Sequence, residues 1–464
     1  MKKIITTILF ITSYFLVVNA QYTKLLDFSG STNGSTPAGS LISDGTYLYG
    51  MTYYGGTSNM GVVFKIKPDG TGYSKLLDFA GTSNGKNAYA SLISDGTFLY
   101  GMTSKGGTND KGVVFKIKPN GTGYSKLLDF SGVANGSIPW GSLVSDGTFL
   151  YGMTQYGGTG SCTTGCGTLF KIMPDGTAYS KLIDFTGATN GSGPTGSLIF
   201  DGTFLYGMTV GGGINNKGTI FKIMSNGTGY SKLLDFDGTT NGNLPFGDLI
   251  SDGINLYGMS WQGGTNNFGV IFNIKSDGTG YTKLHDFAGG VNGKYPNGAL
   301  LSEGAFEYGM TYNGGLSDSG AVFKIMLDGT GYSKLLDFSG SLNGSCPAGS
   351  FISDGTFLYG MTQHGGLHGA GTIFKYALST NEIAEKKMVN GFSLYPNPSD
   401  GTFRISSKEN DYGLIISNVL GKIVYQSEIK NRNSEIDLSS QPKGIYFINI
   451  KTGKETTVLK LIIK

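Results

Sequence analysis

The chain has 464 residues, of which 78 are glycine, and its formal net charge is +3. The glycines follow no three-residue period, which excludes a collagen triple helix, and a content of 12% aromatic against 14% charged residues excludes intrinsic disorder. A nearly neutral charge gives no basic face, so nucleic acid is not an expected partner.

The N-terminal segment has the pattern of a secretory signal peptide. Lys2 and Lys3 precede an apolar run over residues 4–18, and Ala20 supplies a small-residue cleavage site. A membrane anchor is the alternative, but the run is short for one and no basic stop-transfer stretch follows it. We therefore expect residues 1–20 to be removed, and we expect no transmembrane segment in the mature chain.

From residue 22 onward, one pattern returns seven times. Its most regular parts are a Leu-Tyr-Gly-Met-Thr run, a Gly-Gly pair and a Val-Val-Phe-Lys-Ile run. The spacing between copies is 51 residues, with one spacing of 55. The tyrosine of the first run falls at Tyr49, Tyr100, Tyr151, Tyr206, Tyr257, Tyr308 and Tyr359. A fixed period near 50 residues indicates a repeat architecture.

Each copy contains four strand-like runs. In the second copy they cover Ser91–Ile93, Phe98–Thr103, Val113–Lys118 and Tyr124–Phe130. β-Branched and aromatic residues favour strands in these runs, and the Asp-Gly and Pro-Asn-Gly steps between them favour turns. Four short antiparallel strands in about 50 residues predict one blade of a β-propeller.

The chain begins and ends out of phase with the repeat. Tyr22–Phe28 is a fourth-type strand with no copy before it, and the last copy, residues 351–376, lacks its fourth strand. Placing the first strand on the outer edge of the last copy completes seven blades and closes the ring. An open solenoid, the alternative, usually carries polar end caps, and none is visible. We predict an all-β, seven-bladed β-propeller over residues 21–378.

The repeats resemble the GloVer tandem repeat, whose core reads Asp-Gly, Leu-Tyr-Gly, Gly-Gly and Gly-Thr-Val-Phe-Lys. In the fourth copy these steps begin at Asp201, Leu205, Gly211 and Gly218. The resemblance covers all seven copies. The sixth departs most, because residues 302–308 replace the Asp-Gly turn and the leucine. The resemblance implies a repeat module whose biochemical role is unassigned.

The composition changes after residue 378, where the glycine pattern stops. We interpret residues 379–391 as a linker. Residues 392–464 contain about seven short strand-like runs, which predict a small β-sandwich. The Tyr-Pro-Asn-Pro start at Tyr395, the Gly-Ile-Tyr step at Gly444 and the lysine-containing end resemble the type A C-terminal sorting domain of the type IX secretion system. The resemblance implies recognition by that machinery, export through a Gram-negative outer membrane, and release or anchoring at the cell surface.

The chain has three cysteines. Cys162 and Cys166 lie in a four-residue insertion that no other copy has. In an exported protein such a pair is expected to form a local disulfide. Metal binding is the weaker alternative, because no further Cys or His lies nearby in the sequence. Cys346 is interpreted as a small buried residue.

The residues that could carry catalysis repeat too regularly for an active site. One aspartate per copy, such as Asp78, ends the Leu-Leu-Asp-Phe run, and seven equivalent carboxylates indicate strand-end acceptors for backbone N–H groups. His364 and His368 lie in a glycine-rich loop, where their i,i+4 spacing does not imply a shared face. His285 replaces a strand leucine and is interpreted as structural. We expect no metal and no cofactor.

Two loop positions differ from copy to copy, whereas the strands are near copies. The first precedes the first strand and holds Ala38, Tyr89, Trp140, Thr195, Phe246, Asn297 and Ala348. The second precedes the Gly-Gly pair and holds Tyr53-Tyr54, Ser104-Lys105, Gln155-Tyr156, Val210-Gly211, Trp261-Gln262, Tyr312-Asn313 and Gln363-His364. In a four-stranded blade both loops emerge on one face, so we expect both sets to line one mouth.

Aromatic rings interleaved with amides suit a sugar, which offers C–H faces and hydroxyl groups. We therefore expect a monomeric binding or adhesion module for a glycan or surface polymer. The expected contact residues are Tyr53, Tyr54, Tyr89, Trp140, Tyr156, Phe246, Trp261, Gln262, Tyr312 and His364. Three alternatives stay open: side chains that only pack loops together, a structural surface protein, and a polysaccharide hydrolase or lyase. The last would need acid and base groups, and the mouth loops offer only Asp110, Asp237, Asp248 and Asp318.

Overall fold

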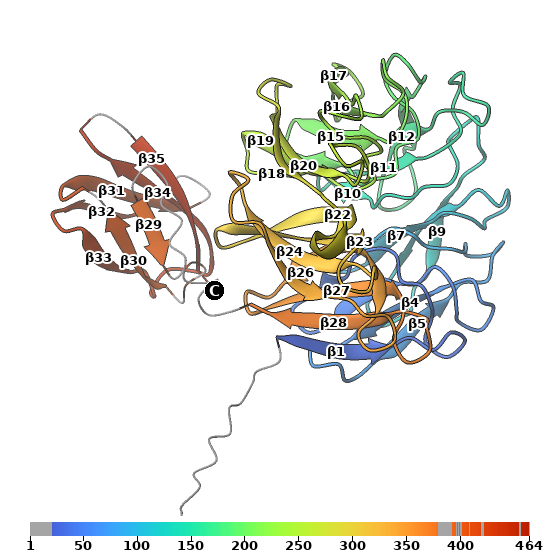
Figure 1. Cartoon of the computed structure of the whole chain (residues 1–464), viewed down its shortest axis with the longest axis horizontal. Helices are drawn as coiled ribbons and strands as arrows, with labels where there is room; N and C mark the ends of the chain where they lie inside the picture. The colour runs from blue at the N-terminus through green and yellow to red at the C-terminus, as the bar shows by residue number, and fades with distance from the viewer. Residues whose placement is uncertain are drawn as a thin grey trace, which may run out of the picture.

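The structure is a computed structural model that describes residues 21–378, 392–395, 397, 399, 401–407, 409–418, 422–453 and 456–463. The predicted signal peptide, residues 1–20, and the predicted linker, residues 379–391, lie outside the described residues. Apart from the short 3-10 turn η1 (Gly290–Asn292), the regular elements described are all strands. Between residues 22 and 377 they form seven four-stranded antiparallel sheets, the blades of a propeller (Figure 1). The predicted fold class is confirmed.

The first strand of each blade lies nearest the axis. These strands are β2 (Ile42–Ser43), β6 (Ile93–Ser94), β10 (Val144–Ser145), β14 (Ile199–Phe200), β18 (Ile250–Ser251), β22 (Lys294–Glu303) and β26 (Ser345–Ser353). β22 and β26 are longer because their pairing with the next strand resumes beyond an irregularity, as in the pair Pro296–Thr311. In the five blades with a two-residue inner strand, an isolated bridge marks the same place, as Ser35–Tyr54 does in the first blade and Lys86–Lys105 in the second.

The second strands carry the Leu-Tyr-Gly step, or Glu-Tyr-Gly in the sixth blade. They are β3 (Leu48–Met51), β7 (Leu99–Thr103), β11 (Leu150–Thr154), β15 (Phe204–Thr209), β19 (Asn255–Ser260), β23 (Phe306–Asn313) and β27 (Phe357–His364). The third strands carry the phenylalanine and are β4 (Val62–Ile66), β8 (Val113–Ile117), β12 (Thr168–Ile172), β16 (Thr219–Met224), β20 (Val270–Lys275), β24 (Ala321–Met326) and β28 (Thr372–Ala377). Nearly all of their side chains are buried, because both faces of these strands pack against neighbouring blades.

The outer strands end in the repeated aspartate. They are β5 (Ser74–Asp78), β9 (Ser125–Asp129), β13 (Ser180–Asp184), β17 (Ser231–Asp235), β21 (Thr282–Asp286), β25 (Ser333–Asp337) and β1 (Tyr22–Asp27). Asp78 shows the role of this residue: Oδ1 accepts the backbone N–H of Thr57 at 2.8 Å, and Lys75 lies 2.7 Å from Oδ2. The carboxylate therefore ties the outer strand to the Gly-Gly loop, as expected.

The ring closes through its two ends. β1 pairs antiparallel with β28, with Tyr22 opposite Tyr376 and Asp27 opposite Thr372, and the two strands lie side by side in Figure 1. The Tyr22 ring stacks on Phe374 at 5.5 Å. The first described strand thus completes the last blade, and the predicted closure is confirmed.

Adjacent blades share their hydrophobic cores. One cluster joins Tyr206, Met208 and Ile220 of the fourth blade to Leu256 and Phe272 of the fifth. The glycine of the Leu-Tyr-Gly step makes room for the phenylalanine of the third strand. A Cβ at Gly258 would lie 2.7 Å from the Phe272 ring. Because each core lies between two blades, a single blade cannot bury its apolar faces alone.

The turn between the first and second strands is held by its aspartate. In the first blade Asp44 Oδ1 accepts the N–H groups of Thr46 and Tyr47, and Oδ2 accepts the hydroxyl of Tyr49 at 2.7 Å. Although burial opposes it, these hydrogen bonds hold the pKa of Asp44 below its ordinary value. The sixth blade departs as expected from its sequence, because Ser302 Oγ there donates to Glu307 Oε1 at 2.7 Å.

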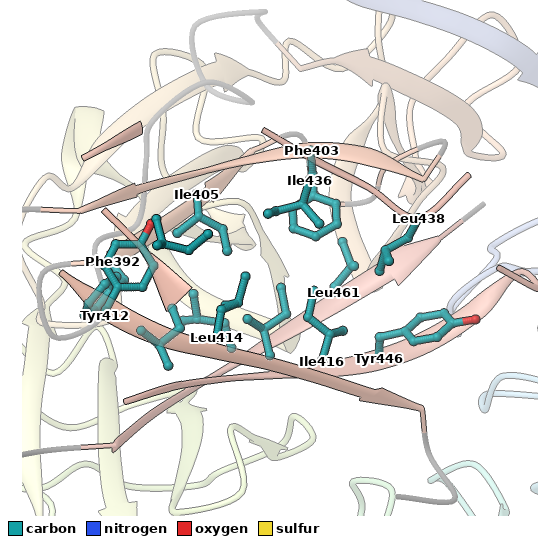
Figure 2. Packing of buried hydrophobic residues seen from close by; sticks show 14 of the residues in the cluster. Phe392, Phe403, Ile405, Tyr412, Leu414, Ile416, Ile436, Leu438, Tyr446 and Leu461 are labelled. Carbon is teal, nitrogen blue, oxygen red and sulfur yellow. The ribbon is translucent and has the colours of Figure 1, made fainter. Parts of the chain in front are cut away.

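The C-terminal unit is a two-sheet β-sandwich. One sheet contains β29 (Phe392–Tyr395), β30 (Thr402–Ser407) and β33 (Asn433–Asp437), and the other contains β32 (Ile423–Ile429), β31 (Tyr412–Asn418), β34 (Gly444–Lys451) and β35 (Thr456–Ile463). Phe403, Ile405, Leu414, Ile416 and Leu461 are buried between the sheets (Figure 2). This unit has its own core, as predicted. Across the described residues, no helix has the length and apolar character needed to cross a bilayer.

Candidate functional site

Main-chain contacts between blades surround the propeller axis. One small residue in each blade lies two positions before Leu41 or the residue equivalent to it. These residues are Gly39, Ala90, Gly141, Gly196, Gly247, Gly298 and Gly349. A Cβ at Gly349 would lie 2.6 Å from the carbonyl oxygen of Gly39 in the next blade, closer than real Cβ atoms approach. We call these seven residues, six glycines and Ala90, the glycine ring. Its close backbone contacts hold neighbouring blades together at the axis.

The residue that follows each of these forms a second circle, which we call the serine ring. Its members are Ser40, Ser91, Ser142, Ser197, Asp248, Ala299 and Ser350. The backbone N–H of Ser40 donates to Oγ of Ser91 at 2.7 Å, and Ser91 donates likewise to Ser142 at 2.9 Å. The N–H of Ser350 donates to Oγ of Ser40 at 2.7 Å, which links the last blade to the first.

Two blades break the uniformity of the serine ring. Asp248 stands in the fifth blade, where its carboxylate accepts the N–H of Ser197. Ala299 stands in the sixth and has no side-chain oxygen to accept the N–H of Asp248. Burial raises the pKa of Asp248, although hydrogen bonds from Ser197 oppose the rise. The one carboxylate of the serine ring therefore lies next to the ring's one member without a side-chain acceptor.

Two cavities that share lining residues lie among the variable loops. A cavity of about 250 Å³, the mouth cavity, is lined by Tyr89, Trp140, Thr195, Phe246, Trp261, Asn297 and Tyr312. A smaller one of about 50 Å³, the axial cavity, shares five of these residues and reaches both rings, including Ser40 and Asp248. Five of the ten predicted contact residues thus lie around one cavity.

One wall of the mouth cavity is a stacked pair of rings. Trp140 lies 4.7 Å from Tyr89, with 14° between the ring planes. Tyr53 contacts the Tyr89 ring edge-on at 6.0 Å and Tyr54 at 4.6 Å. Tyr53, also a predicted contact residue, lines neither cavity, and its place behind Tyr89 makes it a support for that ring.

Trp261 organises a second aromatic wall. Its ring lies 5.2 Å from Tyr312 and 5.8 Å from Phe246, and it stacks on Tyr295 at 5.2 Å and 13°. These contacts bring together residues from the loops of the fifth and sixth blades. A flat indole held by three neighbouring rings has little rotamer freedom left to lose on binding.

Polar groups join the two walls. The hydroxyl of Tyr312 donates to Gln363 Oε1 at 3.2 Å, and Gln363 Nε2 lies 3.5 Å from the hydroxyl of Tyr89. Burial raises the pKa of both phenols, so they are neutral donors at ordinary pH. Thr195 Oγ1 is buried and has no hydrogen-bond partner among the described residues.

The second residue of each variable pair faces away from the mouth cavity. Tyr54, Tyr156, Gln262 and His364 line neither cavity. Tyr54, Tyr156 and Gln262 pair through their backbones with the loop that precedes the inner strand, as Tyr54 does with Ser35. His364 pairs with Ser345 of β26. Successive side chains of an extended segment point to opposite sides, so only one member of each pair can face the axis. These four residues stay predictions as ligand contacts, without support from the geometry.

The four carboxylates considered for catalysis are separated. Asp110 lies 2.9 Å from Lys86 and Asp318 lies 3.0 Å from Lys294, both at the exposed rim. Asp237 accepts the N–H of Thr240 within its own exposed loop. Asp248 alone among the four lines a cavity.

The cysteine and histidine residues have structural surroundings. Cys162 and Cys166 form a disulfide within the insertion loop, and Cys346 is a half-buried free thiol. His285 stacks on Tyr332 at 3.9 Å. His364, which was expected in a loop, is instead the last residue of β27 and is exposed, whereas His368 lies in the loop that follows. Within the described part of the chain, no three His, Cys, Asp or Glu side chains gather to hold a metal ion.

Sequence reasoning missed the serine ring and the position of Asp248 in it. The signal was present, because serine recurs at one position of the repeat and only two copies depart from it. It also left Thr195, Asn297 and Gln363 out of the expected contact residues. Thr195 and Asn297 occupy the same loop position as Trp140 in their blades. Like Trp140, they line the mouth cavity.

The sequence matches two known families. Residues 12–165 and 145–307 match the Gloeobacter/Verrucomicrobia repeat. Residues 393–464 match the secretion system C-terminal sorting domain. Both resemblances stated from the sequence are confirmed. The sorting domain indicates the type IX route and a destination outside the cell or on its surface.

Solved structures with a similar fold have distant sequences. PorZ, a surface component of the type IX secretion system of Porphyromonas gingivalis, is 14% identical with a TM-score of 0.44, over 95% of this chain and 60% of that chain. A putative 6-phosphogluconolactonase from Bacteroides fragilis is 16% identical with a TM-score of 0.46, over 86% of this chain and 98% of that chain. The chain thus spans about three fifths of the PorZ structure. No curated protein matches the sequence.

The repeat family covers well over half of the chain, and from residue 22 to residue 307 the matched segments lie within the propeller. The chain belongs to the Gloeobacter/Verrucomicrobia repeat family and carries a C-terminal sorting domain of the type IX secretion system.

Proposed function

We propose that this exported propeller is a binding module that holds a glycan in the mouth cavity. The observation that carries the proposal is a cavity of about 250 Å³ walled by Tyr89, Trp140, Phe246, Trp261 and Tyr312. Ligand sites combine such apolar walls with a few polar groups that fix orientation. Thr195 and Asn297 in the lining, and Gln363 beside it, supply those groups.

The shape of the cavity favours one sugar unit over a long stretch of polymer. Its volume is about 250 Å³, below the ~300–1,000 Å³ typical of pockets for drug-sized ligands. The C–H faces of a pyranose would lie against Trp140 and Trp261, whose rings are already held by their neighbours. Its hydroxyl groups would pair with the amide of Asn297 and the unpaired oxygen of Thr195. The proposed ligand is therefore the end of a glycan chain.

A hydrolase is disfavoured by the carboxylates of the cavities. Glycoside hydrolysis uses a pair of carboxyl groups about 5–10 Å apart. Among the residues lining the two cavities, Asp248 is the single carboxylate. We therefore propose binding without cleavage.

We also propose a division of the chain into four segments. Residues 1–20 act as the signal peptide, 21–378 as the propeller, 379–391 as the linker and 392–464 as the sorting domain, and the exported propeller acts as a monomer. The sandwich supports this division because its buried cluster contains only residues from 392 onward. Removing residues 392–464 should leave a folded propeller in the periplasm, and its normal appearance outside the cell would contradict the proposal.

A glycan array probed with the purified protein tests the proposal, with reducing-sugar release measured on every glycan that binds. Binding without release is the expected result. Release of reducing sugar would replace the proposal with the enzyme alternative. An array without any binding would favour a structural surface protein whose aromatic residues pack loops together.

A further inference from the structure

We propose that the axial cavity is a subsite for the protonated amine of an amino sugar, with Asp248 as the counter-charge. This inference rests on the proposed glycan function and adds a class of ligand to it. It starts from the departure of Asp248 from the serine ring. A serine at this position would be enough to continue the ring, as in the neighbouring fourth blade at Ser197.

Charge favours a cation. Among the residues that line the two cavities, Asp248 is the only carboxylate, and none of them is Lys, Arg or His. The phenols of Tyr89 and Tyr312 are neutral, and burial raises the pKa of each further above its ordinary value. The faces of aromatic rings also carry negative potential, which attracts an ammonium group. The lining thus favours a positively charged group over a neutral or acidic one.

Size favours a small substituent. The axial cavity measures about 50 Å³, a few times the ~10–15 Å³ that a cavity needs to hold one water molecule. A sugar ring cannot enter such a space, whereas an ammonium group can. Because the axial cavity shares Tyr89, Trp140 and Thr195 with the mouth cavity, a substituent of a sugar held in the mouth can reach it.

Hydrogen bonding gives a second, independent indication of a ligand. Thr195 is 5% exposed and lines both cavities, and its Oγ1 has no partner among the described residues. An ammonium group offers three donors and no acceptor. The carboxylate of Asp248, the hydroxyl of Thr195 and the amide oxygen of Asn297 offer acceptors in the same lining. A cationic donor would therefore satisfy a buried oxygen that is otherwise unpaired.

The test compares three oligosaccharides with one backbone. Oligomers of β-1,4-linked glucosamine, N-acetylglucosamine and glucose carry an amine, an acetamide and a hydroxyl at the same carbon. Calorimetric titration of the purified protein at about pH 6 keeps an ordinary amine protonated. A second titration at about pH 7 favours the ionised form of Asp248, whose pKa is raised by burial. We expect the glucosamine oligomer to bind about 10-fold or more tightly than the other two, the scale of a hydrogen bond to a charged group.

Two substitutions assign the preference to Asp248. Asp248→Asn keeps an oxygen for the N–H of Ser197 but removes the charge, and Asp248→Ser restores the residue found in most other blades. Both should bind the three oligomers with similar affinity and melt as the parent does. Asp237→Asn, a matched change of an exposed carboxylate in the same part of the chain, should keep the preference.

The outcomes separate this inference from the function on which it rests. If the glucose and N-acetylglucosamine oligomers bind as tightly as the amine, the amine subsite is overturned while glycan binding stands. A preference for the amine that survives Asp248→Asn and Asp248→Ser also overturns the subsite. Failure of all three oligomers, together with an empty glycan array, overturns both. Binding of a lysine-containing peptide in place of every glycan would overturn the amino-sugar assignment.

Discussion

Two phenylalanines show how differently the framework and the mouth of this molecule are constrained. Phe221 lies in β16, is fully buried and contacts Phe185 and Tyr230, and every blade has phenylalanine at the equivalent position. Phe246 lies half-buried in the mouth, and other blades have Ala, Tyr, Trp, Thr or Asn there. The residue type is repeated from blade to blade at positions where each blade packs against the same neighbouring residues. Variation is found where the blades face a shared space instead of one another.

We expect the largest effect from removing β1, the strand that gives the seventh blade its fourth strand. Deleting residues 22–27 should expose the edge of β28 and open the ring, since β1 is the strand that covers this edge among the described residues. We expect loss of the cooperative melting transition, or aggregation, measured by calorimetry and light scattering. Deleting six residues from the predicted linker is the control and should leave melting unchanged. A strand-deleted protein that melts like the parent would contradict the closed ring.

The same substitution, phenylalanine to alanine, should cost different amounts of stability in the framework and in the mouth. Phe221→Ala should lower the free energy of unfolding by about 3–5 kcal/mol, because it leaves a cavity between two blades. Phe246→Ala should cost less than about 1 kcal/mol, because its ring borders a cavity already. Urea denaturation measures both. Equal costs would mean that the mouth is a packed part of the core.

Binding should show the opposite pattern. Trp140→Ala and Trp261→Ala should each weaken binding of a glycan found on the array by about 30-fold, or ~2 kcal/mol, because each removes a large, pre-oriented apolar surface. Titration calorimetry gives the affinity, and melting curves run alongside should change little. Val63→Ala, in the framework, is the control that should lower stability but leave affinity unchanged. If both tryptophan variants bind like the parent, the rings serve only to pack loops together.

We expect the smallest effect from His285, a framework residue that differs from its equivalents in the other blades. Burial lowers the pKa of His285 to about 4, although Asp286 opposes this, and the other blades have leucine or isoleucine there. Its folded pKa lies below the unfolded value of ~6.5, so the stability it contributes is present above pH ~6.5 and is lost as the pH falls toward 4. His285→Leu should remove this loss.

Stability measured against pH checks that prediction. Relative to His285→Leu, the parent should lose about 1–2 kcal/mol between pH 7 and pH 5. Partial exposure of the ring reduces the effect from its upper limit. Parallel curves for the two proteins over this interval would show that His285 does not titrate below its ordinary pKa.

The number of blades and the closure of the ring could be predicted from the sequence because both depend on counting. The sequence has one strand too many at Tyr22 and one strand too few after residue 376. Pairing the first strand with the last blade accounts for both. The aromatic mouth could be predicted in outline, because loop positions that vary between near-identical copies stand out by comparison. The sandwich followed from its strand-like runs and from its resemblance to sorting domains.

The orientation of individual mouth residues could not be predicted. In the pair Trp261-Gln262 one side chain faces the cavity and the other faces away, and a shift of one residue would exchange them. The sequence does not show where the irregularity before the inner strand falls. The serine ring was missed for a different reason, because its hydrogen bonds join residues about 51 positions apart, as Ser40 and Ser91 are.

The glycine ring has a consequence for how the gene of such a protein can grow. Duplication of one 51-residue unit would add a blade and widen the circle at the axis. The contact between Gly349 and Gly39 shows that neighbouring main chains already touch there, so a wider circle would separate them and break the bonds of the adjoining serines. The number of units is therefore set by contact at the centre. Extra copies of the unit would have to form a second propeller, whereas an insertion such as Cys162–Cys166 lengthens only the loop between the second and third strands of one blade.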